Sequence, residues 1–189
     1  MAALTFRRAT LDDAPQLRAL TEHAFSTPDS RPDWTGDAVL AAHFTLTLDA
    51  MKASLTASDV VTFAVLDAAG EIIASASVGK KAETGRISML VVHDAHQRGG
   101  LGGRVLAYAE EHCRREWAAR RISLNALSSR TALRAWYARR GYRETGETSP
   151  FPRESGRFAA LAIPDDLCFV EMIKDVEPMQ GDKKTEEEE

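Results

Sequence analysis

Apolar and polar residues alternate along this chain with two different periods, which predict helices and strands in a definite order. Helical spacing, with apolar residues three or four positions apart, occurs at 10–25, 38–55, 104–119 and 128–140. Short apolar runs bounded by turn residues occur at 4–9, 60–66, 71–79, 86–92 and 120–127, and two further strands are expected from 142 and over 166–176. The predicted order is therefore β-α-α-β-β-β-α-β-α-β-β.

This order contains consecutive hairpin strands followed by alternating strands and helices. A purely parallel sheet needs a crossover between its strands, so the order favours an α+β fold of mixed α/β character, with one mostly antiparallel sheet and helices on both faces. No repeat or linker divides 1–174, so we expect a single domain there. Residues 175–189 lack apolar periodicity and are rich in acids, which predicts a disordered acidic tail.

The distribution of charge excludes some classes of partner. The net charge is -4, and the tail, with seven acids and two lysines, contributes -5, so residues 1–174 carry about +1. This balance gives no sign of a nucleic-acid partner. Cys113 and Cys168 stand far apart with no Cys/His cluster, so neither a disulfide framework nor a metal site is expected. No signal-like or membrane-spanning run is visible, so we expect no membrane partner and a cytoplasmic location, with a nuclear one also open.

The stretch "QRGGLGG" (97–103) separates the predicted strand 86–92 from the predicted helix 104–119. A helix N-terminus offers unpaired N–H groups and the positive end of a dipole, and glycines allow a phosphate to approach the backbone closely. The junction could therefore bind a pyrophosphate, although a tight turn without a ligand would also need glycine. The lysine of a Walker A loop and the last glycine of a GxGxxG motif are both missing.

The pattern that does match is Gln-x-x-Gly-x-Gly, at Gln97, Gly100 and Gly102. The segment "MLVVHDAHQRGGLGGRVLAYAEEH" resembles the acetyl-coenzyme A signature of the GNAT (GCN5-related N-acetyltransferase) family, and "ISLNALSSRTALRAWYARRGYRETGE" resembles the family's second signature. With the opening "FRRATLDDAPQLRAL", the resemblance runs over roughly 4–174. It is most similar to a subgroup with "WYxRRGYxxTGE" followed by a Pro-Phe-Pro loop, here 150–152.

The resemblance implies a single GNAT-like domain, with a sheet splayed at its centre, that binds acetyl-CoA. The loop would bind the pyrophosphate through Gln97, Arg98, Gly99, Gly100, Gly102 and Gly103, and the backbone of Leu90, Val91 and Val92 would pair with the pantetheine arm. Asn125 could also bind the arm, or could satisfy a buried backbone group. Arg130 could reach the phosphates, or could pair with an acid. The family often has a basic residue where this chain has Gly99, so one phosphate-directed charge is missing.

The resemblance also implies transfer of the acetyl group to a primary amine by direct attack. Tyr137, four residues before Gly141, matches the family's general acid, which protonates the CoA thiolate, although a core aromatic beside Trp136 is the alternative. The amine must lose a proton first, since an alkylammonium has a pKa near ~10. The strand 86–92 contains no acid, so Glu83 is the nearest candidate base, and an exposed loop charge is the equally open alternative.

The acceptor is a small-molecule or protein amine in the family, and it would bind near Trp34 and Phe151, with Asp33 or Asp37 supplying negative charge. Plain surface is an alternative interpretation of these loops. Family members are often dimeric, which leaves a homodimer open. Two other functions remain: a non-catalytic CoA-binding sensor or docking module, and an acyltransferase with another acyl-CoA or acceptor. A nucleotide-binding loop fits the glycines less well.

Overall fold

The computed structural model describes residues 3–27, 34, 38–153, 158, 161 and 163–179. Within them, seven strands form one sheet in the order β1-β2-β3-β4-β5-β7-β6. The strands are β1 (Thr5–Arg8), β2 (Val60–Leu66), β3 (Ile72–Lys81), β4 (Thr84–Val92), β5 (Arg121–Leu127), β6 (Arg143–Pro150) and β7 (Cys168–Asp175). The helices are α1 (Ala14–Ser26), α2 (Ala38–Ala42), α3 (Leu48–Thr56), α4 (Leu101–Trp117) and α5 (Thr131–Ala138), with 3-10 turns η1 (Leu11–Asp13) and η2 (Asp94–His96).

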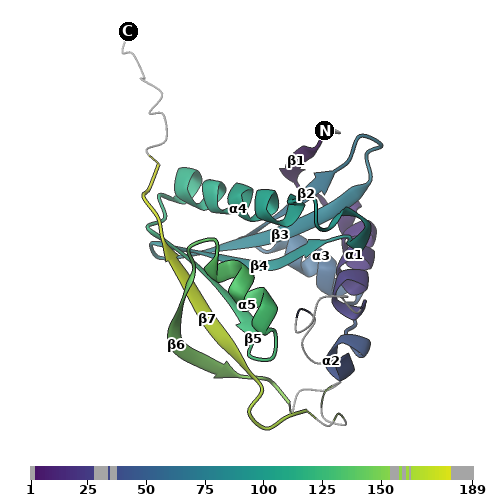
Figure 1. Ribbon diagram of the computed structural model, residues 1–189. Coiled ribbons are helices and arrows are strands. Elements are labelled where there is room, and N and C mark those ends of the chain that lie inside the picture. Colours follow the sequence, from purple (N-terminus) through teal and green to yellow (C-terminus); the bar gives the residue numbers. More distant parts are fainter. Residues whose placement is uncertain are drawn as a thin grey trace.

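The sheet is mixed and mostly antiparallel, as the order of elements predicted. Only β4 and β5 pair in parallel, and their pairing covers just Thr84–Arg86 against Arg121–Ser123. Beyond these residues the two strands separate, which opens the sheet at its centre (Figure 1). The predicted α+β fold with a splayed mixed sheet is confirmed.

Helices cover both faces of the sheet. The helix α4 lies along one face (Figure 1) and buries Leu101, Val105, Ala109 and Cys113, the apolar face that the i, i+4 spacing predicted. The helix α5 packs into the same core through Leu133 and Tyr137. On the other face, α1 and α3 form a second core, whose buried residues include Leu17, Leu20, Met51, Ile72 and Val91.

All four predicted helices differ from the observed ones in their bounds, and local contacts explain two of the differences. The stretch 38–55 forms two helices, α2 and α3, because Thr47 caps α3: its hydroxyl accepts a hydrogen bond from the Ala50 N–H at 3.1 Å. The predicted helix 128–140 begins later, as α5 at Thr131, with Arg130 as its N-cap. Ser128 is instead still tied to β7, and its N–H donates to the Cys168 carbonyl at 2.8 Å.

The C-terminal part of the described chain belongs to the sheet. Asp175 is the last residue of β7 and forms ion pairs with Arg121 at 3.1 Å and Arg143 at 2.9 Å. Residues 180–189, most of the predicted acidic tail, lie outside the described residues. Both cysteines are free thiols, and none of the described helices has the length and apolar character needed to cross a bilayer.

Candidate active site

A β-bulge interrupts β4 where the sheet opens. In the pairing with β3, Ser88 is opposite Ser77 and Val91 is opposite Ser75, so Met89 and Leu90 together stand opposite Ala76. Met89 adopts a left-handed conformation with φ of 49°. As a result Leu90 packs toward the core under α4, while Val91 is buried in the core under α1. The bulge therefore redirects the backbone of β4 at the point where β5 no longer pairs with it.

The glycine-rich stretch lies at the predicted junction, but only 97–100 form the loop, because α4 begins at Leu101 and includes Gly102 and Gly103. Gly100 is the N-cap of α4 with φ of 81°, a conformation that side chains disfavour. A Cβ atom added at Gly99 or Gly100 would meet no atom within 4 Å, so the space in front of the backbone is open. The first N–H groups of the 17-residue helix begin at this opening, with the positive end of its dipole. The geometry suits an anionic group such as a phosphate.

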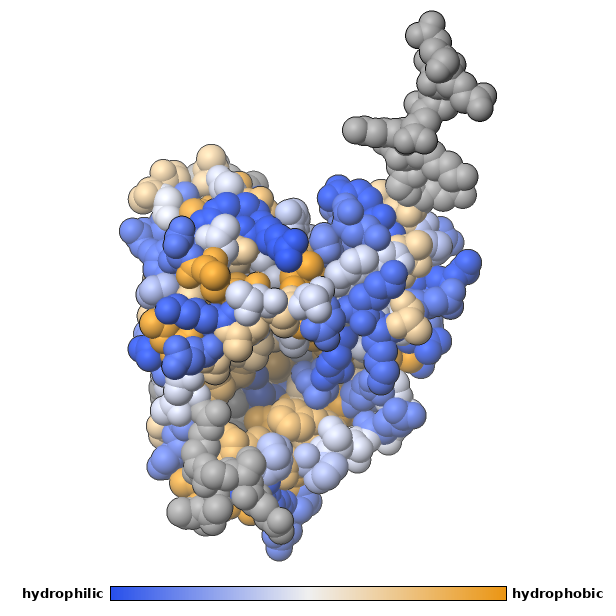
Figure 2. Space-filling view, turned by 180° about the vertical axis from the view of Figure 1, so that it is seen from behind, coloured by the Kyte–Doolittle hydropathy of each residue, from blue (hydrophilic) through white to orange (hydrophobic). Residues whose placement is uncertain are grey.

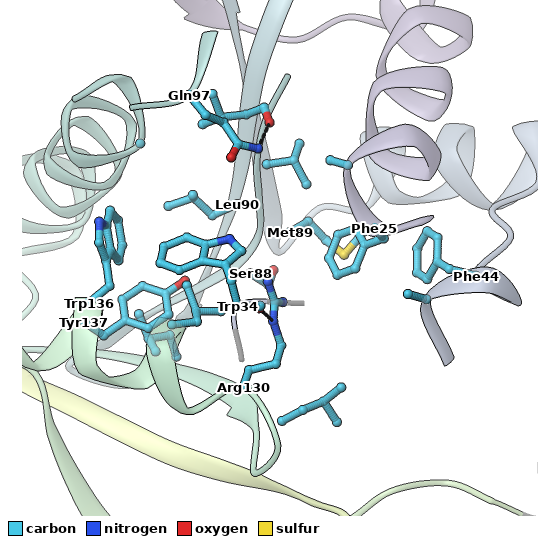
Figure 3. A pocket seen from close by; sticks show the side chains of 18 of the residues that line it. Phe25, Trp34, Phe44, Ser88, Met89, Leu90, Gln97, Arg130, Trp136 and Tyr137 are labelled. Atoms are coloured by element: carbon cyan, nitrogen blue, oxygen red, sulfur yellow. Dashed lines mark hydrogen bonds between the residues drawn. The ribbon is translucent and has the colours of Figure 1, made fainter. Parts of the chain in front are cut away.

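Gln97 and Arg98 begin this loop with different roles. Gln97 Nε2 donates a hydrogen bond to the Val92 carbonyl oxygen at 3.0 Å (Figure 3), so its side chain ties the loop to the end of β4. Arg98 has φ of 65° and lines the cavity beside the loop.

Arg140 is a further basic residue at the loop that the sequence interpretation did not identify. Its guanidinium lies 3.7 Å above the centre of the Trp136 ring, and its Nη1 donates to the Trp136 carbonyl at 3.1 Å. A Cβ atom at Gly103 would lie 3.3 Å from Arg140 Nη2, so the guanidinium reaches the first turn of α4. The i, i+4 spacing of Trp136 and Arg140 in "WYARR" was the available signal.

The bulge, the loop and α5 enclose one cavity of about 1070 Å³. Seen from behind, the molecule is hollowed in its middle, with hydrophobic residues on the floor of the hollow (Figure 2). The candidate residues that line the cavity come from five parts of the chain: Trp34, Leu90, Val91, Val92, Gln97, Arg98, Gly100, Gly102, Gly103, Asn125, Arg130, Tyr137 and Phe151. Gly99 and Glu83 are the predicted residues that do not line it.

Tyr137 lies on α5 beside the cavity. Its ring packs edge-on against Trp136 at 5.0 Å and Tyr142 at 5.7 Å, and its hydroxyl makes no hydrogen bond within the described residues. In the close-up the hydroxyl points into the cavity, toward Trp34 (Figure 3). Burial raises the pKa of Tyr137, while Arg130 and Arg140 act in the opposite direction. The group is therefore a neutral hydroxyl that can donate a proton.

Glu83 lies at the turn between β3 and β4, at the opposite end of β4 from the glycine loop. Its side chain is 75 % exposed and its carboxylate lies 3.5 Å from Arg120 Nε. The structure does not bring Glu83 to the cavity, because β4 is extended and separates its two ends. Its surroundings are those of an exposed loop charge.

The side of the cavity away from the loop is rich in aromatic residues. Trp34 packs edge-on to Trp136 at 6.2 Å, and its carbonyl accepts a hydrogen bond from Arg130 Nε at 2.8 Å. In the close-up (Figure 3), Arg130 thus lies at the opposite end of the cavity from Gln97. This position separates Arg130 from the loop that could bind a phosphate. Across the cavity, Phe25 stacks on Phe44 at 4.6 Å.

Phe151 is a buried member of a small apolar cluster at this end. Its ring centre lies 5.0 Å from Phe158 and 5.7 Å from Phe169. It therefore supports the wall of the cavity more than it projects from it. Asp33 and Asp37, the acids expected near the acceptor, lie outside the described residues.

Three polar side chains meet at the rim of the cavity. Asp94 Oδ1 lies 3.0 Å from His23 Nε2 and 2.9 Å from His93 Nδ1, and the hydrogen bond from His23 lowers the pKa of Asp94. In the described part of the chain this trio is the one group of three such side chains near enough to share a metal ion. These contacts join the end of α1 to the segment after β4.

One glycine outside the motif is required by close packing. A Cβ atom at Gly85 on β4 would lie 2.5 Å from Cys113 Sγ on α4, well inside contact distance. Burial raises the pKa of the Cys113 thiol to about 12, so this group stays a neutral, unreactive part of the core. Gly85 brings α4 close to the start of β4, and so positions the loop that follows β4.

A splayed sheet, a bulge in β4 and a glycine loop at a helix N-terminus together form this site. A model of the acetyltransferase (GNAT) domain family matches residues 30–154, and the chain belongs to that family. The family's fold implies acyl transfer from an acyl-CoA. Comparison with curated proteins by sequence gave no match.

Solved structures share this fold over nearly the whole chain. The PaiA N-acetyltransferase of Thermoplasma acidophilum, solved in complex with coenzyme A, superposes with a TM-score of 0.69 at 11% identity, covering 92% of this chain and 99% of that one. A ribosomal-protein-alanine N-acetyltransferase of Brucella melitensis gives 0.66 at 19% identity, covering 91% and 99%. A GNAT acetyltransferase of Streptococcus pneumoniae gives 0.65 at 19%, covering 92% and 100%. At these identities the likeness concerns the fold, and the open glycine loop fits a CoA-type cofactor.

Proposed function

We propose that this protein is an N-acetyltransferase that moves the acetyl group of acetyl-CoA to a primary amine. The observation that carries the proposal is that one cavity joins three features that the reaction needs. These are a candidate phosphate-binding site at Gly100, a bulged edge of β4 that no strand pairs with on the β5 side, and the hydroxyl of Tyr137.

The cofactor would be held by the loop and by the edge of β4. The N–H groups at the start of α4 would bind the pyrophosphate, with Arg98 and Arg140 supplying positive charge. Arg140 would supply the positive charge that is missing at position 99, where this chain has glycine. The pantetheine arm would lie along β4 from Val92 to Leu90, with Asn125 across the gap on β5.

The bulge and Tyr137 would act on the thioester. A backbone N–H of the bulge at Leu90, with no strand partner on the β5 side, would donate a hydrogen bond to the thioester carbonyl as negative charge develops there. The amine nitrogen bonds to the acetyl carbon as the carbon–sulfur bond breaks. Tyr137 would donate its proton to the leaving thiolate, and its raised pKa keeps it protonated for that task.

The acceptor would enter from the aromatic side of the cavity. Phe25, Phe44 and Met89 lie together there, opposite Trp136 and Tyr137 (Figure 3). These side chains favour an amine that carries an apolar or aromatic group, either a small molecule or the N-terminus of a protein.

The first experiment is heat unfolding with acetyl-CoA, beside CoA, ATP and NAD. A ligand at about 100 times its Kd stabilises the folded state by about 2.7 kcal/mol, or roughly 5–10 °C for a chain of this length. A shift with acetyl-CoA, followed by thiol release with an amine from an aromatic and aliphatic panel, supports the proposal. A shift with ATP or NAD alone contradicts it.

A matched pair of variants tests the loop itself. Gly100 and Gly70 both have positive φ, 81° and 85°, and an added Cβ would meet no atom within 4 Å at either position. Valine should therefore destabilise both sites through backbone strain. Only Gly100→Val should lose the shift with acetyl-CoA, whereas Gly70→Val should keep it. If the wild-type chain binds acetyl-CoA but releases no thiol with any amine, a non-catalytic CoA-binding sensor or docking module is favoured. A preference for a longer acyl-CoA or for a hydroxyl acceptor would favour an acyltransferase with another acyl-CoA or acceptor.

A further inference from the structure

We propose that Glu171 accepts the proton that the amine must lose, and that Asn125 positions the amine or a bridging water beside it. This inference rests on the proposed N-acetyltransferase function. It assigns the base to β7, whereas the candidate from the sequence was Glu83.

The pairing of β5 with β7 brings the two side chains together. Asn125 is directly opposite Glu171 in this antiparallel ladder, so both side chains point to the same face of the sheet, with Cβ atoms roughly 4.5–5.5 Å apart. Their neighbours Leu124 and Met172 point to the other face and are buried in the core under α4. Asn125 and Glu171 therefore face away from α4.

Asn125 stands in the opening of the sheet. The pairing between β4 and β5 ends at Ser123, and Asn125 is the next residue of β5 with the same orientation. It lines the main cavity that also holds Tyr137, and it lines a second cavity of about 190 Å³ with Glu171. A group bound at the splay can therefore contact Asn125 on one side and reach the carboxylate on the other.

The two polar groups lack partners in the folded chain. Glu171 is half-buried, and its carboxylate makes no hydrogen bond or ion pair within the described residues; the same holds for the Asn125 amide. By contrast, Glu144 lies 2.7 Å from Arg134, and Glu110 on α4 lies 2.6 Å from Lys174. Both polar groups are therefore available to a ligand or a water in the two cavities that Asn125 lines.

Two other charged groups share the second cavity with Glu171. Arg86 projects from β4, and Glu147 projects from β6, where it is exposed. Arg86 places a positive charge in the lining of this cavity. Glu147 is a second carboxylate in the same small cavity, and this makes it a matched control.

Glu171 and Tyr137 together account for every proton that moves in the reaction. Glu171 takes one proton from the alkylammonium, directly or through a water on Asn125, and leaves a neutral amine whose lone pair attacks the acetyl carbon. The carbon–nitrogen bond forms and the carbon–sulfur bond breaks. Tyr137 protonates the thiolate and regains a proton from the acylated nitrogen. Glu171 then returns its proton to solvent through the second cavity.

The test is the pH–rate profile of Glu171→Gln, which keeps the shape of the side chain and removes its basicity. Below the pKa of the amine, kcat/KM should fall by about 10²-fold or more. The loss should shrink as the pH rises toward about 10, because the amine then deprotonates by itself. The thermal shift with acetyl-CoA should stay as in the wild-type chain.

The control is Glu147→Gln, which should keep the wild-type rate and profile. The inference is overturned if Glu171→Gln keeps the wild-type profile, if it loses the same factor at every pH, or if Glu147→Gln shows the pH-dependent loss instead. A wild-type chain that binds acetyl-CoA and acetylates no amine would remove the proposed function, and this inference with it.

Discussion

Two tyrosines of the same core, Tyr137 and Tyr142, differ in what their hydroxyls can do. Tyr142 donates a hydrogen bond to Glu110 Oε1 at 2.9 Å, and its pKa is raised by burial and by that carboxylate. Tyr137 packs against Tyr142, but its hydroxyl has no such acceptor within the described residues and borders the cavity. At the scale of the residue, the environment assigns Tyr142 to structure and leaves Tyr137 available for chemistry.

Replacing Tyr137 with Phe removes the proton donor and keeps the ring in its packing. We expect kcat to fall by about 10²-fold with little change in KM for acetyl-CoA, because a general acid acts on the leaving group. Burial raises the pKa of Tyr137, so in the wild-type chain no loss of rate from this group is expected below pH 10.

Steady-state kinetics on three proteins measure this effect. Tyr142→Phe is the control: it should lower stability, because Glu110 loses a hydrogen bond in a partly buried site, while kcat changes little. If Tyr137→Phe retains the wild-type kcat, Tyr137 is a core aromatic, as its packing against Trp136 would also allow.

At the scale of the element, Asp13 anchors the start of α1 to β1. Its two carboxylate oxygens accept hydrogen bonds from the Arg7 guanidinium, both at 2.7 Å, and one also accepts from the Thr10 N–H at 2.7 Å. The hydrogen bonds from Arg7 are the main reason that the pKa of Asp13 falls to about 2. The helix that forms one rim of the cavity is therefore held to the edge of the sheet by one charged group.

Removing this charge should cost stability in a pH-dependent way. The folded pKa of about 2 lies below the reference value of 3.8, so the stabilisation is fully present above about pH 4 and is lost as the pH falls through 2. We expect Asp13→Asn to lower the free energy of unfolding by about 2 kcal/mol at pH 7. The difference from the wild-type chain should shrink toward pH 2.

Urea unfolding at several pH values measures this difference. Asp12→Asn is the control, since Asp12 is the exposed neighbour in the same turn and should change stability little. A constant difference between Asp13→Asn and the wild-type chain at all pH values would contradict the ion-pair explanation.

At the scale of the whole molecule, the sheet is open between β4 and β5, and helices cover it on both sides of this opening (Figure 1). The pairing of β4 with β5 ends at Arg86, and the cavity fills the gap between α1 on one side and α5 on the other. Backbone groups along this edge of β4 have no strand partner on the β5 side. An extended ligand arm can take the place of that partner, so binding should protect the edge as strand pairing would.

Hydrogen exchange with and without acetyl-CoA tests this arrangement. Amides in peptides over 86–92 should exchange about tenfold more slowly with saturating acetyl-CoA, because the bound state blocks local opening. Peptides over 48–56, in α3 on the other face of the sheet, should change little. Equal slowing of both regions would indicate global stabilisation instead of strand-like binding in the gap.

Local patterns in the sequence determined much of this protein. The order of strands and helices, the buried face of α4 and the turn at Gly100 follow from periodicity and from backbone preference, and these act over a few residues. Backbone preference also marked the glycine loop as a candidate, whereas Tyr137 became one only through the resemblance of its segment to the family signature. The local patterns erred where a side chain redirected the backbone, as Thr47 does between α2 and α3.

The tertiary structure alone decided which distant residues meet. The bulge at Met89 depends on the register against β3, Arg140 reaches Gly103 only once α5 packs beside α4, and Glu171 faces Asn125 only because β7 pairs with β5. Glu83, the candidate base chosen because it is close to β4 in the sequence, lies outside the cavity, because the tertiary structure and not sequence distance decides which residues line it. Strand register is set by the burial of whole faces over long sequence separations, so no short stretch of sequence encodes it.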